Sequence, residues 1–131
     1  AGRLGNIRFL GHVSDEDKAA LLQLARAFVF PSHLRSEAFG MSLIEASMFS
    51  KPMISCEIGS GTSYVNQHGV TGLVVPPESP QDLAVAIERL ARNPEMARTM
   101  GLAARQRYEQ LFAGKKMAEA YFSTYQRMLA R

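Results

Sequence analysis

The sequence has one cysteine and no tryptophan, and no apolar run in it is long enough to cross a membrane. A single thiol, Cys56, excludes an internal disulfide and any metal site built from several cysteines, and its apolar surroundings favour a small buried residue. A membrane-spanning helix needs about 20 apolar residues, and the first residues lack the basic-then-apolar order of a signal peptide. We therefore expect a cytoplasmic protein in which any membrane contact is peripheral, on the cytoplasmic face.

Blocks of one charge are also missing. The 15 Lys and Arg residues are spread along the chain, so a net charge of +3 and a pI near 9.3 arise without the basic runs typical of nucleic-acid binding. We expect no nucleic-acid partner. With 131 residues, 47% of them hydrophobic, the chain has the size and composition of one globular domain. It begins without Met, and we expect a segment of a longer protein.

Short apolar runs alternate with segments of helical periodicity. This alternation predicts an α/β fold, a Rossmann-like parallel sheet flanked by helices. The predicted strands are 7–10, 27–30, 53–56 and 73–75. The predicted helices are 15–26, 40–49, a short one around Tyr64, and three in the closing helical region 79–131, which start near 79, 94 and 115. The last helix carries a stripe of Met and aromatic residues that we interpret as a docking face.

Acidic residues mark the start of the first predicted helix. Ser14 is followed three residues later by Asp17, an arrangement typical of a helix N-terminus. Asp15 and Asp17 resemble the carboxylate pair that holds a metal ion in many sugar transferases. We interpret them instead as first-turn acids, which the helix dipole favours, and we predict no metal site.

Residues 37–45 form the stretch around which the rest of the chain is arranged. They follow an apolar strand, and Gly40 opens a segment of helical periodicity, which predicts a helix N-terminus there. The first amides of a helix lack partners and carry partial positive charge, so an anion can bind to them. Glu37 and Glu45 could accept hydrogen bonds from hydroxyl groups on either side of that anion. A ligand with a central phosphate and a polyol at each end, such as a nucleotide sugar, would fit.

Without the rest of the chain, residues 37–45 are explained equally well by a turn that binds no ligand. Two solvated glutamates on either side of a common turn would have the same spacing. The Gly-rich stretch 59–64 is weak support, since it lacks the third glycine of a dinucleotide fingerprint. However, residues 11–13, 37–42 and 59–64 each follow a predicted strand. Ligands of parallel sheets bind at the carboxyl ends of the strands, so we expect these three loops on one edge of the sheet.

Several motifs occur in order over nearly the whole chain: Asn6-x-x-Phe9-x-Gly11-x-Val13, Glu37-x-Phe39-Gly40-x4-Glu45-Ala46, Gly69-x-Thr71-Gly72-Leu73-x-Val75-Pro76-Pro77 and Gly101-x-x-Ala104-Arg105. Together they resemble the C-terminal, donor-binding half of retaining GT-B glycosyltransferases, of the bacterial group 1, family 4 type. That family includes mannosyl- and glucosyltransferases of the cell envelope. The resemblance implies the C-terminal half of a GT-B fold, truncated at its N-terminus, as a single partial domain over residues 1–131.

The resemblance also implies a role for each matching residue. The backbone of Val13 would contact the nucleotide base. Glu37, the predicted catalytic residue, would bind hydroxyls of the transferred sugar, and Glu45 would bind the ribose hydroxyls. The sugar and diphosphate would be held by the backbone amides of Phe39, Gly40, Met41 and Ser42.

The activity implied is that of a hexosyltransferase, such as a mannosyltransferase, in polysaccharide assembly. Its donor would be a nucleotide sugar such as GDP- or UDP-hexose, with no metal ion and no other cofactor. A glycan or lipid-linked acceptor would bind to an N-terminal domain outside this chain. The family's Arg/Lys pair, which neutralises the leaving diphosphate, also lies outside it, so we expect the isolated chain to be inactive.

Two other readings stay open. Nucleotide-sugar epimerases and hydrolases share the architecture, although residues 37–45 and 71–77 fit transferases better. A non-catalytic module that binds a nucleotide sugar is the second alternative. The stretch 59–65 departs from the Gly-Gly-x-Pro-Glu loop that many transferases of the family carry.

Overall fold

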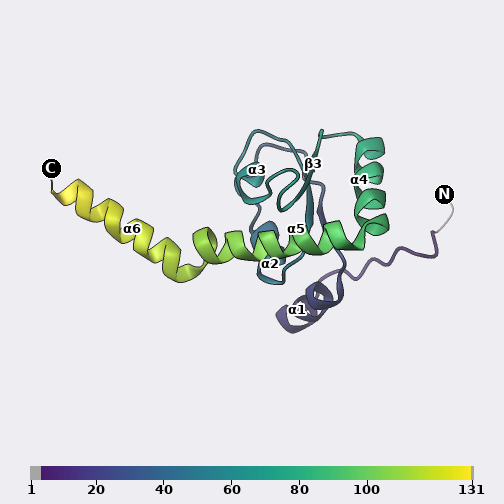
Figure 1. The fold of residues 1–131 in the computed structure, drawn as a ribbon, viewed down its shortest axis with the longest axis horizontal. Helices are drawn as coiled ribbons and strands as arrows, with labels where there is room; N and C mark the ends of the chain where they lie inside the picture. The colour runs from purple at the N-terminus through teal and green to yellow at the C-terminus, as the bar shows by residue number, and fades with distance from the viewer. Residues whose placement is uncertain (1–3, 131) are drawn as a thin grey trace.

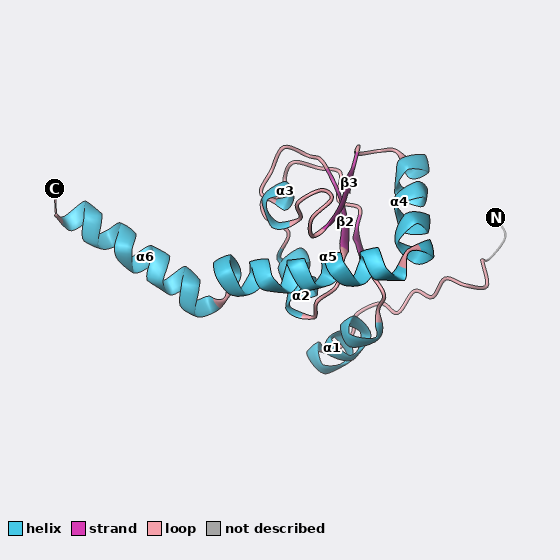
Figure 2. Cartoon of the chain, viewed as in Figure 1, coloured by secondary structure: helices cyan, strands magenta, loops and turns pink. Residues whose placement is uncertain are grey.

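A computed structural model of the chain describes residues 4–130. The sheet contains β1 (Phe28–Phe30), β2 (Met53–Cys56) and β3 (Gly72–Val75). The helices are α1 (Asp15–Leu24), α2 (Met41–Met48), α3 (Thr62–Val65), α4 (Pro80–Arg92), α5 (Pro94–Arg107), the π-helical turn η1 (Tyr108–Phe112) and α6 (Gly114–Leu129). Figure 2 shows the strands at the centre of the body with helices around them. The α/β class predicted from the sequence is confirmed.

The three strands are parallel and adjacent in the order β1-β2-β3. Val29 pairs with Ile54, and Ile54 pairs with Leu73. Parallel neighbours need a crossover connection, which α2 supplies between β1 and β2 and α3 between β2 and β3. Because all three strands run in the same direction, the loops that follow them lie at one edge of the sheet.

Each face of the sheet is covered by its own hydrophobic cluster. Successive side chains of a strand point to opposite faces, so Met53 packs with Leu43 of α2 and Phe112 of η1, whereas Ile54 packs with Leu90 of α4. Met53, Ile54 and Leu43 are fully buried. Truncating a buried residue of this kind to Ala typically lowers the free energy of unfolding by about 2–5 kcal/mol. The well-packed sheet therefore holds the loops at its edge in place.

The buried side-chain amide of Asn66 links β2 to β3 by hydrogen bonds. The Asn66 Nδ2 donates to the Ser55 hydroxyl at 2.9 Å and to the backbone oxygen of Leu73 at 3.2 Å, and its Oδ1 accepts from Thr71 at 3.0 Å. A buried polar side chain is stabilising when it is hydrogen-bonded in this way. Asn66 therefore fixes the chain between α3 and β3.

The predicted strand 7–10 is wrong. These residues form no strand, and Phe9 is 97% exposed. A strand needs a hydrogen-bonded neighbour, and in the part of the chain that the structure describes β1 pairs with β2 alone, while no strand reaches the segment 7–10. In Figure 1 the N-terminal segment runs away from the body. A second, smaller difference concerns α4. The helical spacing of Leu83, Ala86, Ile87 and Leu90 predicts one buried face, but Ile87 is 43% exposed.

Helix α6 projects from the body (Figure 1) and has no buried residue. The Met and aromatic stripe of this helix is exposed, together with Leu129 beside it: Met117, Tyr121, Phe122, Tyr125 and Met128 are the residues of the stripe. None of the described helices is both long and apolar enough to cross a bilayer.

Candidate functional site

The turn before α2 is held by the side chain of Glu37. Its Oε1 accepts a hydrogen bond from the Gly40 N–H at 3.0 Å. Gly40 has φ 75° and ψ 65°, in the left-handed region, and a Cβ there would lie 2.9 Å from Cδ1 of Leu43. Both facts require glycine, because other residues are strained at this φ and would clash. The spacing of Glu37 and Gly40 thus builds a fixed turn.

The start of α2 presents backbone donors that no side chain caps. Gly40 is the N-cap residue and offers no side chain to the first turn. The next amides, those of Met41 and Ser42, lie in that first turn, where helix geometry provides no backbone acceptor. Both belong to the predicted anion-binding set of Phe39, Gly40, Met41 and Ser42 amides. The Gly40 amide differs, since an anion would have to displace Glu37 from it.

The loop after β2 packs against this turn, so two of the three predicted loops, 37–42 and 59–64, lie together, while the third, 11–13, follows no strand in the described part of the chain. The Gly61 N–H donates to the backbone oxygen of Ala38 at 2.8 Å, and a Cβ on Gly61 would lie 2.6 Å from Cδ2 of Phe39. The loop is also tied within itself, because Glu57 accepts from the Gly59 N–H at 3.0 Å and from the Ser63 hydroxyl at 2.8 Å. Residues 37–42 and 59–64 therefore form one continuous surface.

Glu45 is held from a different element. Its Oε2 lies 2.9 Å from the Nζ of Lys18, in the first part of α1. The hydrogen bond and charge of Glu45 raise the pKa of the Lys18 ammonium above its usual value of 10.5. Val13 directly precedes Ser14, whose hydroxyl caps α1 by accepting from the Asp17 N–H at 3.1 Å. The ion pair thus joins the helix that follows the first predicted loop, 11–13, to the helix of the Glu37 motif.

Sequence reasoning missed Lys18. The residue lies on a helix whose apolar periodicity says nothing about which polar side chain meets another helix. Asp15, which the sequence left as a first-turn acid, lies 3.5 Å from the same Lys18 ammonium. Among residues 4–130, no three side chains of His, Cys, Asp or Glu gather in a way that could hold a metal ion.

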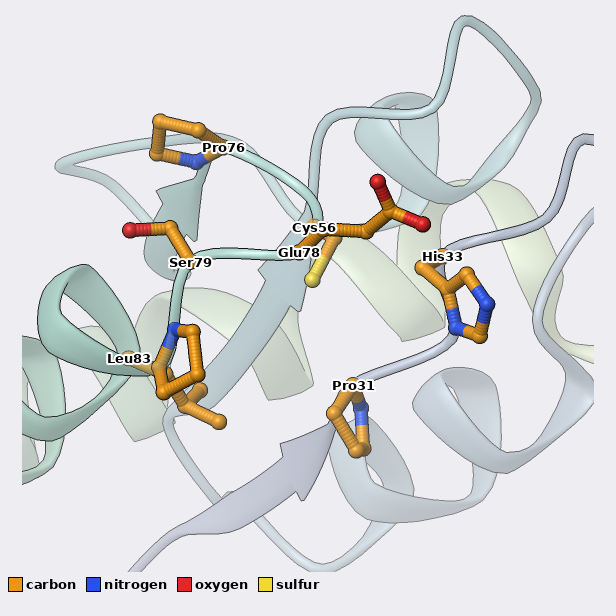
Figure 3. Close-up of a pocket in the computed structure, with 8 residues that line it drawn as sticks. Pro31, His33, Cys56, Pro76, Glu78, Ser79 and Leu83 are labelled. Carbon is orange, nitrogen blue, oxygen red and sulfur yellow. The ribbon is translucent and has the colours of Figure 1, made fainter.

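A separate cavity of about 190 Å³ opens where the three strands end. Pro31, Cys56 and Pro76, from the ends of β1, β2 and β3, line it together with His33 and Glu78. Figure 3 shows the Glu78 carboxylate directed toward the side on which His33 lies. Cys56 is buried as predicted, and its burial raises the pKa of the thiol. None of the predicted site residues lines this cavity.

These features define an α/β domain of the Rossmann-like type with a candidate anion site at one helix N-terminus. Residues 1–107 match the family described as glycosyl transferases group 1. The chain belongs to this family.

Two relatives are similar over most of the chain. The D-rhamnosyltransferase WbpZ of Pseudomonas aeruginosa is 62% identical over 109 residues, 83% of this chain and 29% of that protein. The O-antigen chain mannosyltransferase C of Escherichia coli is 48% identical over 126 residues, 96% of this chain and 34% of that protein. The chain therefore spans about a third of the length of these curated relatives.

Solved structures share the fold. Sucrose-phosphate synthase from Thermosynechococcus elongatus superposes with a TM-score of 0.83 at 32% identity, over 94% of this chain and 30% of that one. HepE of Anabaena, solved with UDP-glucose, gives a TM-score of 0.75 at 23% identity, over 91% of this chain and 33% of that one. The match to part of larger GT-B glycosyltransferases agrees with the truncated C-terminal half expected from the motifs.

Proposed function

We propose that this chain is the donor-binding part of a retaining hexosyltransferase. The observation that carries the proposal is the Glu37 turn, which places a carboxylate beside the N-terminus of α2, while Glu45 lies on the same helix. Membership of the glycosyl transferases group 1 family supports it. Residues 1–131 then form one partial, nucleotide-sugar-binding domain of a longer enzyme.

Each proposed contact follows from the chemistry of the residue. Oε2 of Glu37 accepts a hydrogen bond from a hydroxyl of the transferred sugar, while Oε1 keeps its bond to the Gly40 N–H. The amides of Met41 and Ser42 bind the diphosphate, and those of Phe39 and Gly40 lie next to them on the sugar side. Glu45 accepts from the ribose hydroxyls, and the backbone of Val13 meets the base. This set makes up the proposed donor site.

The proposed reaction breaks the bond between the anomeric carbon and the diphosphate oxygen and forms a bond from that carbon to the acceptor hydroxyl oxygen on the same face of the sugar. The proton of the hydroxyl passes to the leaving diphosphate, on which negative charge grows as its bond to the sugar breaks. Aligned N–H donors at Met41 and Ser42 stabilise that charge, the type of contact that usually contributes most to such catalysis. In this proposal no metal ion takes part, so transfer persists in excess EDTA.

The sugar we propose is mannose or a relative of mannose. Two curated relatives carry the names D-rhamnosyltransferase and mannosyltransferase, and D-rhamnose is mannose without its 6-hydroxyl. GDP-linked and UDP-linked donors are both compatible with the residues of this chain. A glycan or lipid-linked acceptor, bound by a part of the enzyme outside this chain, completes the reaction at the cytoplasmic face of the membrane, where the enzyme makes a peripheral contact.

Calorimetric titration tests the proposal. GDP, UDP, ADP and their hexose conjugates are titrated into the full-length protein and its Glu45→Ala variant. We expect the nucleotides of one base to bind. Glu45→Ala should lower their affinity by about tenfold or more, which is the effect of losing a hydrogen bond to a charged group. Failure of every nucleotide to bind to the folded protein would contradict the proposal.

Product analysis separates the related activities. The full-length protein incubated with its donor alone should leave nearly all of it intact. An epimerised sugar or rapid release of free sugar would identify an epimerase or a hydrolase instead. Binding of the donor without transfer to any cell-envelope acceptor would indicate a non-catalytic module.

A further inference from the structure

In the ion pair between Lys18 and Glu45, the lysine contacts one of the two oxygens of the Glu45 carboxylate. The Lys18 ammonium contacts Oε2 of Glu45 at 2.9 Å, while the structure gives Oε1 no hydrogen-bond partner among residues 4–130. One oxygen of the carboxylate is therefore fixed and the other is available. A hydroxyl donor that approaches Glu45 meets an acceptor whose position is set in advance.

Stability alone does not account for this pair. Both side chains are partly exposed, at 45% for Lys18 and 36% for Glu45, and an ion pair with that exposure adds little to folding. Helix α1 has other contacts with the body. Leu22 packs in the hydrophobic cluster with Leu43 and Ile44 of α2, and Lys51 donates to the backbone oxygen of Gln23 at 2.8 Å. The position of α1 thus does not depend on Lys18.

The charges around Glu45 make a fixed cation useful there. Asp15 lies 3.5 Å from Lys18, so two carboxylates share one ammonium. Without Lys18, the flexible side chain of Glu45 would lose its one ionic partner among residues 4–130 and keep a nearby negative charge. It would then spend less time in any one orientation, and each hydrogen bond formed by it would cost more conformational entropy.

We propose that Lys18 is a positioning residue for nucleotide binding: it holds Oε2 of Glu45 so that Oε1 accepts a hydrogen bond from a ribose hydroxyl. This inference rests on the proposed role of Glu45 in the donor site. Lys18 acts through Glu45 and does not itself contact the nucleotide. It therefore affects the recognition of ribose hydroxyls and not the attraction of the protein for phosphate.

The experiment compares two ligands on the full-length protein. One is the nucleoside diphosphate that the protein binds, and the other is its 2′,3′-dideoxy analogue, which lacks both ribose hydroxyls. The ratio of their affinities isolates the contribution of the hydroxyls. We expect Lys18→Met to lower this ratio about fivefold, Lys18→Arg to keep most of it, and Glu45→Ala to lower it about tenfold or more.

A double variant and a control make the test specific. In the Glu45→Ala background, Lys18→Met should cause no further change in the ratio, because its effect needs the carboxylate. Lys51→Met is the matched control, since Lys51 also ties α1 to the body but makes its bond to Gln23. It should leave the ratio unchanged.

Several outcomes would overturn the inference. An equal loss of affinity for both ligands in Lys18→Met would show that Lys18 attracts phosphate, and a loss that persists in the Glu45→Ala background would show that it acts independently. If Glu45→Ala lowers the ratio but Lys18→Met does not, the inference fails while the proposed donor site stands. If the wild-type protein does not distinguish the two ligands, the ribose assignment of Glu45 fails together with the inference.

Discussion

Glu37 and Glu45 are two glutamates of one motif, and they are held in opposite ways. Glu37 is fastened within its own turn by the N–H of Gly40, three residues ahead. Glu45 is fastened by Lys18, a side chain of another helix. A bond to the backbone lasts as long as the fold does, whereas a partly exposed ion pair can exchange with solvent and ligand. The sugar end of the proposed site is thus rigid, and the ribose end depends on a second side chain.

The largest expected effect comes from breaking the rigid end. Glu37→Ala removes both the acceptor for Gly40 and the proposed contact with the transferred sugar. We expect the rate of transfer by the full-length enzyme to fall by about a hundredfold or more, the usual loss when an aligned electrostatic contact is removed. Glu37→Gln keeps an acceptor for the Gly40 N–H and should retain the folded turn. Transfer near the wild-type rate in Glu37→Ala would contradict the role of Glu37.

Gly61→Ala should disturb the rigid end without touching Glu45. The new Cβ would lie 2.7 Å from the backbone oxygen of Ala38 and 2.6 Å from Phe39, so the turn must shift. We expect a loss of about 1–3 kcal/mol in the free energy of unfolding, as is typical of overpacking, and a slower transfer. Denaturant unfolding and a transfer assay measure the two effects. A transfer rate at the wild-type level in a destabilised Gly61→Ala protein would contradict the coupling between the loop 59–64 and the turn at Glu37.

Gly40→Ala should cost about 1–2 kcal/mol, because an alanine at φ 75° is strained and meets Leu43. The matched control is Gly114→Ala, at the start of α6, where a Cβ meets nothing within 4 Å. Alanine favours a helix more than glycine does, so this variant should gain up to about 1 kcal/mol. Denaturant unfolding compares both with the wild type, and a neutral Gly40→Ala would contradict the strained turn.

The smallest effect concerns the pH dependence of the stability contributed by the ion pair between Lys18 and Glu45. Because Glu45 raises the pKa of Lys18 in the folded state, the folded protein holds this proton more tightly than the unfolded chain. The stabilisation is therefore fully present below pH 10.5, the usual pKa of lysine, and is lost as the pH rises through the higher folded-state pKa. A small stability difference between wild type and Lys18→Met should shrink above that pH. Lys51→Met is the control, and a difference that grows with pH would contradict the ion pair.

The two ends also differ in how far the sequence could predict them. The turn at Glu37 is local, so the spacing to Gly40 and the helix that follows were enough to place it. The same holds for the cap at Ser14, which accepts a hydrogen bond from Asp17, three residues ahead. The apolar runs of β1, β2 and β3 predicted strands correctly because each of them has a parallel neighbour in the sheet. The pairing of Lys18 with Glu45 joins residues far apart in the chain, and no periodicity identifies it.

The wrong strand at 7–10 has a related cause. Its apolar residues have the composition of a strand, but a strand forms when another strand offers hydrogen bonds, and that requirement is not written in the segment itself. The exposure of Ile87 also depends on distant contacts. Helical spacing predicts the centre of a buried face more reliably than its edge, and Ile87 lies at the edge. Local signals were sufficient for the turn and the caps, while contacts between distant elements required the structure.

The central claim is that Glu37 binds the transferred sugar and Glu45 binds the ribose. Its most direct test is a pair of titrations on the full-length protein. A nucleoside diphosphate and the corresponding nucleotide sugar are each titrated into Glu37→Ala and Glu45→Ala. We expect Glu45→Ala to weaken both ligands by about tenfold or more, whereas Glu37→Ala should weaken the nucleotide sugar more than the nucleoside diphosphate, which keeps its contact with Glu45 and loses affinity only as far as the turn at Gly40 loosens. Two results would contradict this expectation. One is a Glu37→Ala variant that loses as much affinity for the nucleoside diphosphate as for the nucleotide sugar, and the other is a Glu45→Ala variant that binds the nucleoside diphosphate as the wild type does.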